Sequence, residues 1–210
     1  MPTYSNFMSC IHISDVQLGV LETKKLQSSA VKKIVSTCVD SEEEVDLSNF
    51  SLSELPDDVF LLIKLKKIRR FSVSNNLLMT VPVSVASMIN LTNLNISNNQ
   101  ISKLPRELVH CKNLETLNIS MNSFVEVPHF LWDLKTLQQI VATKNFVSEV
   151  DENLLYKSTL MILDIRDNPL TTNFYKTLSV RKENDDPEDK LKIVFSNQNV
   201  DDEDWTDLSI

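Results

Sequence analysis

Apolar and polar residues alternate in short runs along the middle of the chain, and this pattern returns at a fixed interval. The run Leu94-x-Ile96 is followed 23 residues later by Leu117-x-Ile119 and, two intervals further on, by Leu163-x-Ile165. Alternation with a period of two predicts a short strand with one buried face. The chain is therefore predicted to form one short strand in each repeating unit.

Five asparagines mark the repeat, each placed just after one of these strands. They are Asn76, Asn99, Asn122, Asn145 and Asn168, and each gap is 23 residues. The units begin near residues 42, 68, 91, 114, 137 and 160. An asparagine side chain donates and accepts hydrogen bonds at once, so stacked copies can satisfy backbone groups at the turn after each strand. We assign these five residues to a structural asparagine ladder.

The second half of each unit is predicted to return on the opposite side of the molecule. A Leu-Pro or Val-Pro pair breaks the strand pattern in three units, at 81–82, 104–105 and 127–128. Val85, Leu108 and Leu131 then re-enter the core from a helical segment. No single unit can bury its own apolar row, so stacking of units must stabilise the fold.

Both ends of the array need a cap, because an uncovered unit would expose its core. The first unit is 26 residues long and carries Phe50 where asparagine is expected, which is typical of an end unit. Apolar residues recur at helical spacing over 24–40 and predict an amphipathic capping helix. At the other end, a second cap is predicted by Leu170, Phe174, Tyr175 and Leu178. Residues 191–195 are expected to add an edge strand or to dock over the last unit.

The units resemble leucine-rich repeats of the LxxLxLxxNxLxxLPxxLxxLxx type, of the kind found in intracellular proteins. The clearest examples are LTNLNISNNQISKLPRELVHCKN from Leu91 and LETLNISMNSFVEVPHFLWDLKT from Leu114. This resemblance implies an α/β fold, a right-handed curved solenoid with a parallel sheet on its concave side. It also implies a protein-interaction module rather than an enzyme.

Charge divides the chain into three parts. Residues 183–210 contain ten acidic and two basic residues, whereas the rest of the chain carries 19 of each sign. We therefore predict an unassigned segment at 1–23, a capped repeat domain at 24–182 and an acidic tail at 183–210. Nucleic-acid binding is not expected, since the phosphate backbone requires a net basic surface.

The residues that carry chemistry are few and scattered. One glycine, Gly19, cannot supply the glycine-rich loops that cradle phosphates. The cysteines and histidines are Cys10, Cys38, Cys111, His12, His110 and His129. Their spacing matches neither a metal-binding motif nor a catalytic set of nucleophile, base and orienting group. We expect no cofactor, no metal and no catalysis. We further expect a monomeric protein of the cytoplasm, and of the nucleus as a second compartment, that does not enter a membrane.

Strand residues between the buried positions are predicted to point to the concave side. The middle units place small polar side chains there, and the later units place Val141, Ile162 and Met121. The candidate protein-binding residues are Asn95, Thr116, Asn118, Met121, Gln139, Val141, Ile162 and Asp164. Exposed apolar clusters often mark contact sites. The alternative is that valine and isoleucine simply favour strands and that the tail covers them.

Three functions are compatible with this pattern. The first is an adaptor or regulatory subunit that binds a helix or loop of another protein on the concave face. The second is an acidic-tail chaperone of basic proteins, although LKIVFSNQN interrupts the acidic residues of the tail. The third is a targeting or regulatory subunit of a phosphatase or a GTPase, to which the sequence assigns no residue.

Overall fold

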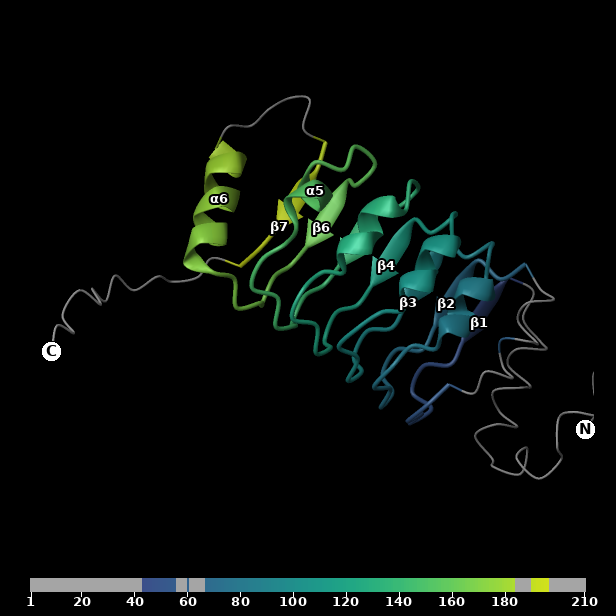
Figure 1. Cartoon of the computed structure of the whole chain (residues 1–210). Helices are drawn as coiled ribbons and strands as arrows, with labels where there is room; N and C mark the ends of the chain where they lie inside the picture. The colour runs from purple at the N-terminus through teal and green to yellow at the C-terminus, as the bar shows by residue number, and fades with distance from the viewer. Residues whose placement is uncertain (1–42, 56–59, 61–66, 184–189, 197–210) are drawn as a thin grey trace, which may run out of the picture.

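A computed structural model describes residues 43–55, 60, 67–183 and 190–196. The segment at 1–23, the capping helix expected over 24–40 and most of the acidic tail lie outside the described residues. Within the described part, the repeating units stack side by side along one axis (Figure 1).

Seven parallel strands form one open sheet in the order β1-β2-β3-β4-β5-β6-β7. Each strand has three residues, and a shift of one repeating unit aligns them, so that Leu94 pairs with Leu117 and Leu117 with Ile140. The strands are β1 (Glu44–Asp46), β2 (Arg70–Ser72), β3 (Asn93–Asn95), β4 (Thr116–Asn118), β5 (Gln139–Val141), β6 (Ile162–Asp164) and β7 (Lys192–Val194). The parallel sheet of a leucine-rich repeat solenoid is thereby confirmed.

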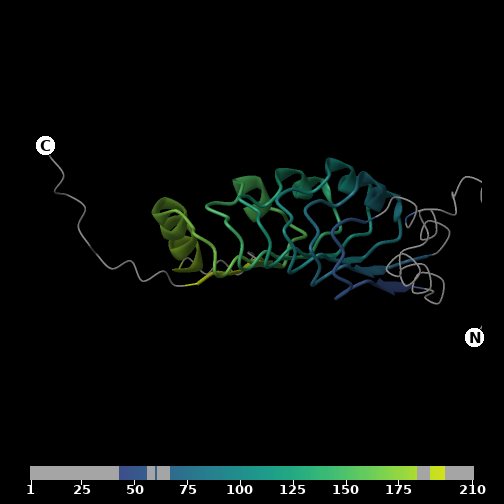
Figure 2. The same ribbon diagram turned by 90° about the horizontal axis from the view of Figure 1, so that it is seen from below.

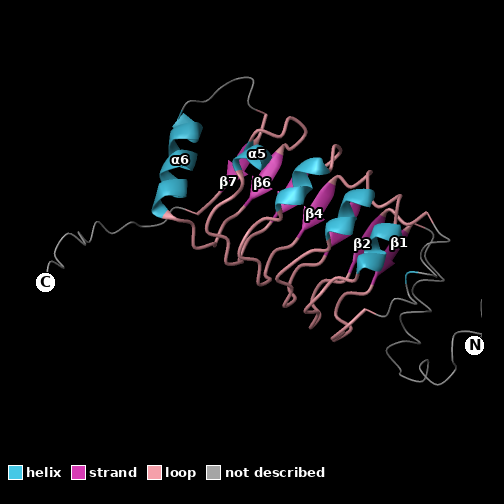
Figure 3. Cartoon of the chain, in the orientation of Figure 1, coloured by secondary structure: helices cyan, strands magenta, loops and turns pink. Residues whose placement is uncertain are grey.

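Short helices cover the opposite side of the sheet (Figures 2 and 3). Three are 3-10 helices and one is a single α-helical turn, namely η2 (Val83–Ser87), η3 (Arg106–His110), η4 (His129–Asp133) and α5 (Glu152–Leu155). A proline precedes each 3-10 helix, because its fixed φ suits the residue at which a helix begins. Val85, Leu108 and Leu131 are fully buried, as the repeat pattern predicts.

The apolar core lies between the sheet and the helices and runs the length of the array. The middle residue of each strand from β1 to β6 is buried, and so is the second residue after it, as with Leu94 and Ile96. Phe60 of the first unit packs edge-on against Phe71 of β2, with ring centroids 6.0 Å apart. Each fully buried Val, Leu, Ile or Phe side chain of this core contributes about 1.5–3 kcal/mol to stability.

A longer helix and the last strand close the carboxyl-terminal end. Helix α6 (Thr172–Glu183) buries Phe174 and Leu178, which confirms the predicted cap. Strand β7 pairs with β6, so residues 191–195 contribute an edge strand. Tyr175 of α6 contacts Phe195 edge-on at 5.4 Å between ring centroids. The segment 183–210 therefore includes one element of the sheet.

The five repeated asparagines tie neighbouring units together. The Nδ2 of Asn122 donates to the carbonyl oxygen of Ile96 in the preceding unit at 3.0 Å. Its Oδ1 accepts the backbone N–H of Ile101 in that same unit, also at 3.0 Å. Nδ2 makes two further bonds to carbonyls of its own turn. Equivalent bonds to the preceding unit recur at Asn76, Asn99, Asn145 and Asn168.

The residue before each ladder asparagine has a left-handed backbone, a conformation that the sequence pattern did not predict. These residues are Asn49 before Phe50, then Asn75, Asn98, Met121, Lys144 and Asp167, with φ between 53° and 62°. Asparagine and aspartate tolerate this region better than other non-glycine residues. Asparagine or aspartate thus occupies four of these six positions, where other proteins often use glycine, and Met121 and Lys144 occupy the other two.

Replacing Asn122 with alanine is expected to lower the free energy of unfolding by about 2–5 kcal/mol, because the buried Ile101 N then loses its acceptor and Ile96 O keeps only one of its two donors, Asn99 Nδ2. Urea unfolding measures the change. Asn113→Ala is the matched control, since exposed Asn113 donates one bond, to Ile89 O at 2.9 Å, and its loss should cost less than about 1 kcal/mol. Equal losses in the two variants would contradict a ladder role.

Candidate functional site

The outward-pointing side chains of the seven strands form one continuous surface, which we call the sheet face. Seven of the eight predicted binding residues lie in two adjacent rows of it. One row runs through Asn95, Asn118, Val141 and Asp164, and the other through Thr116, Gln139 and Ile162. The eighth, Met121, lies just beyond β4 in the left-handed turn and is 45% exposed.

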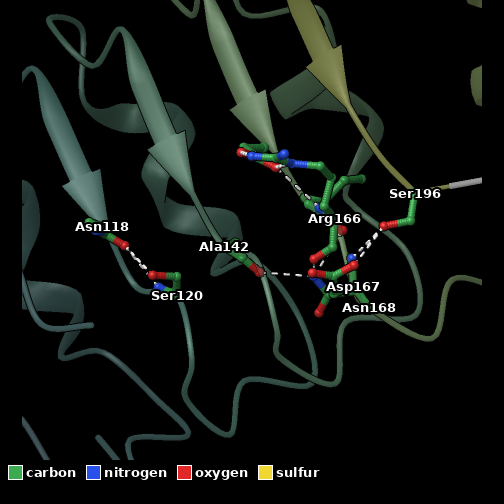
Figure 4. Close-up of polar contacts among 9 residues, drawn as sticks. Asn118, Ser120, Ala142, Arg166, Asp167, Asn168 and Ser196 are labelled. Carbon is green, nitrogen blue, oxygen red and sulfur yellow. Dashed lines mark hydrogen bonds and ion pairs between the residues drawn. The ribbon is translucent and has the colours of Figure 1, made fainter. Parts of the chain in front are cut away.

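Asn95 and Asn118 are held in one orientation by their own backbone. The Oδ1 of Asn95 accepts the N–H of Ser97 at 3.1 Å, and the Oδ1 of Asn118 accepts the N–H of Ser120 at 3.0 Å. The hydroxyl of Ser120 donates a second bond to Asn118, at 2.7 Å (Figure 4). Within the described residues neither Nδ2 group has a partner. The two side chains therefore present fixed hydrogen-bond donors on the sheet face.

The next unit breaks this polar row. Val141 stands where Asn95 and Asn118 stand in earlier units, and it offers no oxygen to the backbone that follows. Ile162 similarly replaces the polar Thr116 and Gln139 of its row. Both Val141 and Ile162 are half-buried, so each leaves part of an apolar side chain open to a ligand. The apolar area directly adjoins the donors of Asn118.

An ion pair borders the apolar area on the far side from Asn118. Asp164 is nearly buried, with 12% of its side chain exposed, and both of its oxygens are bound by Arg166 at 2.9 and 2.7 Å (Figure 4). The hydrogen bond and the charge of Asp164 raise the pKa of Arg166. With both carboxylate oxygens occupied, Asp164 fixes Arg166 rather than offering a free carboxylate.

The sheet face is hollowed at its other end, over β1 to β3. A shallow hollow of about 450 Å³ is lined by polar and charged side chains, among them Glu44, Asp46, Arg70 and Asn95. Arg70 pairs with Glu44 at 2.8 Å, and one oxygen of Asp46 accepts the N–H of Ser48 at 2.9 Å. The predicted site included only Asn95 of these residues. The sequence signal that could have indicated this hollow is the set of charged residues at the strand positions of the first two units, Glu44, Asp46 and Arg70.

The reactive side chains of the repeat domain lie elsewhere. His110 and His129 belong to η3 and η4 on the helical side and are exposed. Cys111 is fully buried, and this burial raises the pKa of its thiol to about 11. Among the described residues, no group of three or more His, Cys, Asp or Glu side chains is arranged to hold a metal ion.

Comparison with known proteins finds the same kind of repeat elsewhere. A family model of leucine-rich repeats, two copies long, matches residues 89–130. The structure of a leucine-rich repeat protein from Leptospira interrogans is similar, with a TM-score of 0.62 and 27% sequence identity. The match covers 73% of this chain and 37% of that chain, so this chain corresponds to little more than a third of that relative.

The comparison with curated proteins gives no match. Over the part of the chain that the structure describes, no helix has the length and apolar character needed to cross a membrane. The family match and the structural neighbour together support the leucine-rich repeat superfamily.

Because the thiol of Cys111 is buried, we predict that the free energy of unfolding depends on pH. Because burial raises the pKa of Cys111 from 9.0 to about 11, the unfolded state loses its proton first as the pH rises. The protonated Cys111 thiol therefore adds about 2–3 kcal/mol to the free energy of unfolding below pH 9, and this contribution disappears as the pH rises towards 11. The measurement is the difference in unfolding free energy between wild type and Cys111→Ala at pH 8 and pH 10.5. A difference that stays constant with pH would contradict this assignment.

Proposed function

We propose that this leucine-rich repeat protein is a non-catalytic interaction module that binds a helix or loop of a partner protein on its sheet face. The observation that carries the proposal is the juxtaposition of fixed donors on Asn95 and Asn118 with the apolar side chains of Val141 and Ile162. Orienting donors beside an apolar anchor are the usual elements of a binding interface.

Each part of the site has a separate task in this proposal. The Nδ2 groups of Asn95 and Asn118 donate to carbonyl or carboxylate oxygens of the partner, and Thr116 and Gln139 add bonds that adapt to its shape. Val141, Ile162 and Met121 bury apolar side chains of the partner, while Asp164 holds Arg166 in place. Seven strands at about 4.8 Å span roughly 29 Å, a length that suits a single helix or loop.

The biological role is an adaptor or regulatory subunit. Within the superfamily, we propose a relationship to leucine-rich repeat-containing protein 20, based on the overlong first unit, the five matching units and the closing LDIRDNPL. We also propose a monomer located in the cytoplasm, and in the nucleus as a second compartment. A targeting subunit of a phosphatase or GTPase is a special case of the same proposal, and no described residue favours it.

The competing proposal is an acidic-tail chaperone of basic proteins. Deleting all of 183–210 would not test it cleanly, because this deletion also removes β7 from the sheet. A truncation after Ser196 keeps β7 and removes five of the ten acidic residues of the tail. The interaction module predicts unchanged binding in this truncation, measured by calorimetry with the captured partner. Loss of salt-sensitive binding to basic proteins would favour the chaperone instead.

Substituting the apolar residues with those of sister units tests the proposed site. Val141→Asn with Ile162→Thr copies Asn118 and Thr116 and should leave the melting temperature unchanged or slightly raised, because the introduced asparagine can accept the N–H of Thr143 as Asn118 accepts that of Ser120. Partner affinity should fall at least about tenfold through loss of apolar burial. Differential capture from an extract of the cells that make the protein, followed by titration and thermal unfolding, measures both quantities.

The matched control makes the same chemical changes away from the sheet face. Val125 is 62% exposed and Ile89 is 63% exposed, and neither belongs to a strand. Val125→Asn with Ile89→Thr should retain every partner that the wild type captures. Equal capture by wild type and by the Val141→Asn, Ile162→Thr variant would contradict binding on the sheet face.

A further inference from the structure

Two of the left-handed turns contain residues that this conformation disfavours. Asparagine or aspartate occupies the equivalent position in four of the six turns, but the fourth unit has Met121 at φ 54° and the fifth has Lys144 at φ 53°. For a residue such as methionine or lysine the left-handed backbone conformation is unfavourable, whereas asparagine adopts it more readily. Costly backbone conformations tend to persist where a side chain has a function.

Met121 and Lys144 stand side by side at the edge of the sheet face. In the same row, Asn98 Nδ2 donates to Asn75 Oδ1 at 2.7 Å, which shows that side chains of neighbouring turns meet. The N–H of Met121 donates to Thr143 O at 2.8 Å, two residues beyond Val141. The row of Met121 is therefore separated from that of Val141 only by the row of Ser120 and Thr143, and Lys144 follows Met121 in its row.

Two exposed lysines border the apolar area without an ion pair among the described residues: Lys144 in the turn after β5, and Lys192 of β7, which lies in register beside Ile162. Arg166 is bound to Asp164 through two hydrogen bonds. The carboxylate of Asp167, next in the row after Lys144, accepts the hydroxyl of Ser196 at 2.9 Å. The apolar area is thus bordered by unpaired positive charges.

We propose that Met121 and Lys144 select the partner, which is a protein segment carrying an acidic residue beside an apolar one. The apolar side chain of the segment packs on Met121 and Val141, and the carboxylate pairs with Lys144. In the hollow at β1 to β3, Arg70 pairs with Glu44, and Asp46 leaves a net negative charge at the other end of the sheet face. A bound segment consequently has a preferred direction, with its acidic end over β5. This inference rests on the proposed function.

The first arm of the test measures how much the left-handed backbone at Met121 and Lys144 lowers the stability of the fold. Met121→Asn and Lys144→Asn copy Asn98, so each should raise the melting temperature by roughly 2–8 °C while weakening partner binding. Gln100→Asn, an exposed change in a neighbouring loop, should leave the melting temperature within about 1 °C. Unchanged or lower melting temperatures in both turn variants would overturn the claim that these residues are retained at a cost.

The second arm reads partner chemistry directly with a display library of random twelve-residue peptides. Peptides selected on the wild-type chain should be enriched in an acidic residue next to an apolar one. Selection on Lys144→Glu should shift the enrichment to basic residues, and wild-type peptides should bind this variant at least about tenfold more weakly. Lys135→Glu, the same charge change on an exposed lysine beyond η4, should select the same peptides as wild type.

The outcomes separate this inference from the proposed function. Peptides that depend on Val141 and Ile162 but lack acidic enrichment, and that bind Lys144→Glu as well as wild type, would overturn the role of Lys144 and leave the binding face standing. Peptides that bind the Val141→Asn, Ile162→Thr variant as well as wild type would contradict the binding face itself.

Discussion

The turn after a strand leaves backbone groups cut off from water, and in the five units from residue 68 onward the side chain of a buried or half-buried asparagine satisfies those groups. The Nδ2 of the asparagine binds a carbonyl of the preceding unit, while its Oδ1 accepts an N–H of that unit. Because one side chain serves two units, it sets their spacing as well as their stability. The alignment of β1 to β6, and therefore most of the sheet face, depends on this contact.

The sheet face also carries asparagine side chains, but these leave their amino groups available to a partner. On the inside, both the oxygen and the amino group of the asparagine are bound. On the outside, Asn95 and Asn118 use only their oxygens, so the amino groups remain as donors in fixed positions. Where Val141 replaces asparagine, the row turns apolar without disturbing the strand, because the backbone pairing of β5 to β4 and β6 is unaffected. A regular scaffold thus tolerates local variation on its outer surface, which is where a binding surface can evolve.

The sequence predicted the parts of the molecule that follow from periodicity, and it missed those that depend on conformation. The period of two identified Leu94 and Ile96 as core residues, and the 23-residue interval aligned β2 to β6 correctly. Spacing could not show that Asp164 is occupied by Arg166, since that depends on side-chain orientation. The left-handed turns were missed because glycine is the usual signal for positive φ, and the only glycine of this chain, Gly19, lies far from them. The hollow over β1 to β3 arises from the shape of the first three units together.

Binding on the sheet face requires that the amide donors of Asn95 and Asn118 meet the partner while the buried asparagines keep their bonds, and nuclear magnetic resonance observes both sets of side-chain amides directly. Side-chain amide signals of Asn95 and Asn118 would be followed as a selected peptide is titrated into the labelled protein, with Asn122 and Asn145 as internal references. We expect the first pair to shift and the second pair to remain in place. Shifts confined to residues of η2, η3 and η4, with Asn95 and Asn118 unmoved, would show that partners bind the helical side and would contradict the account.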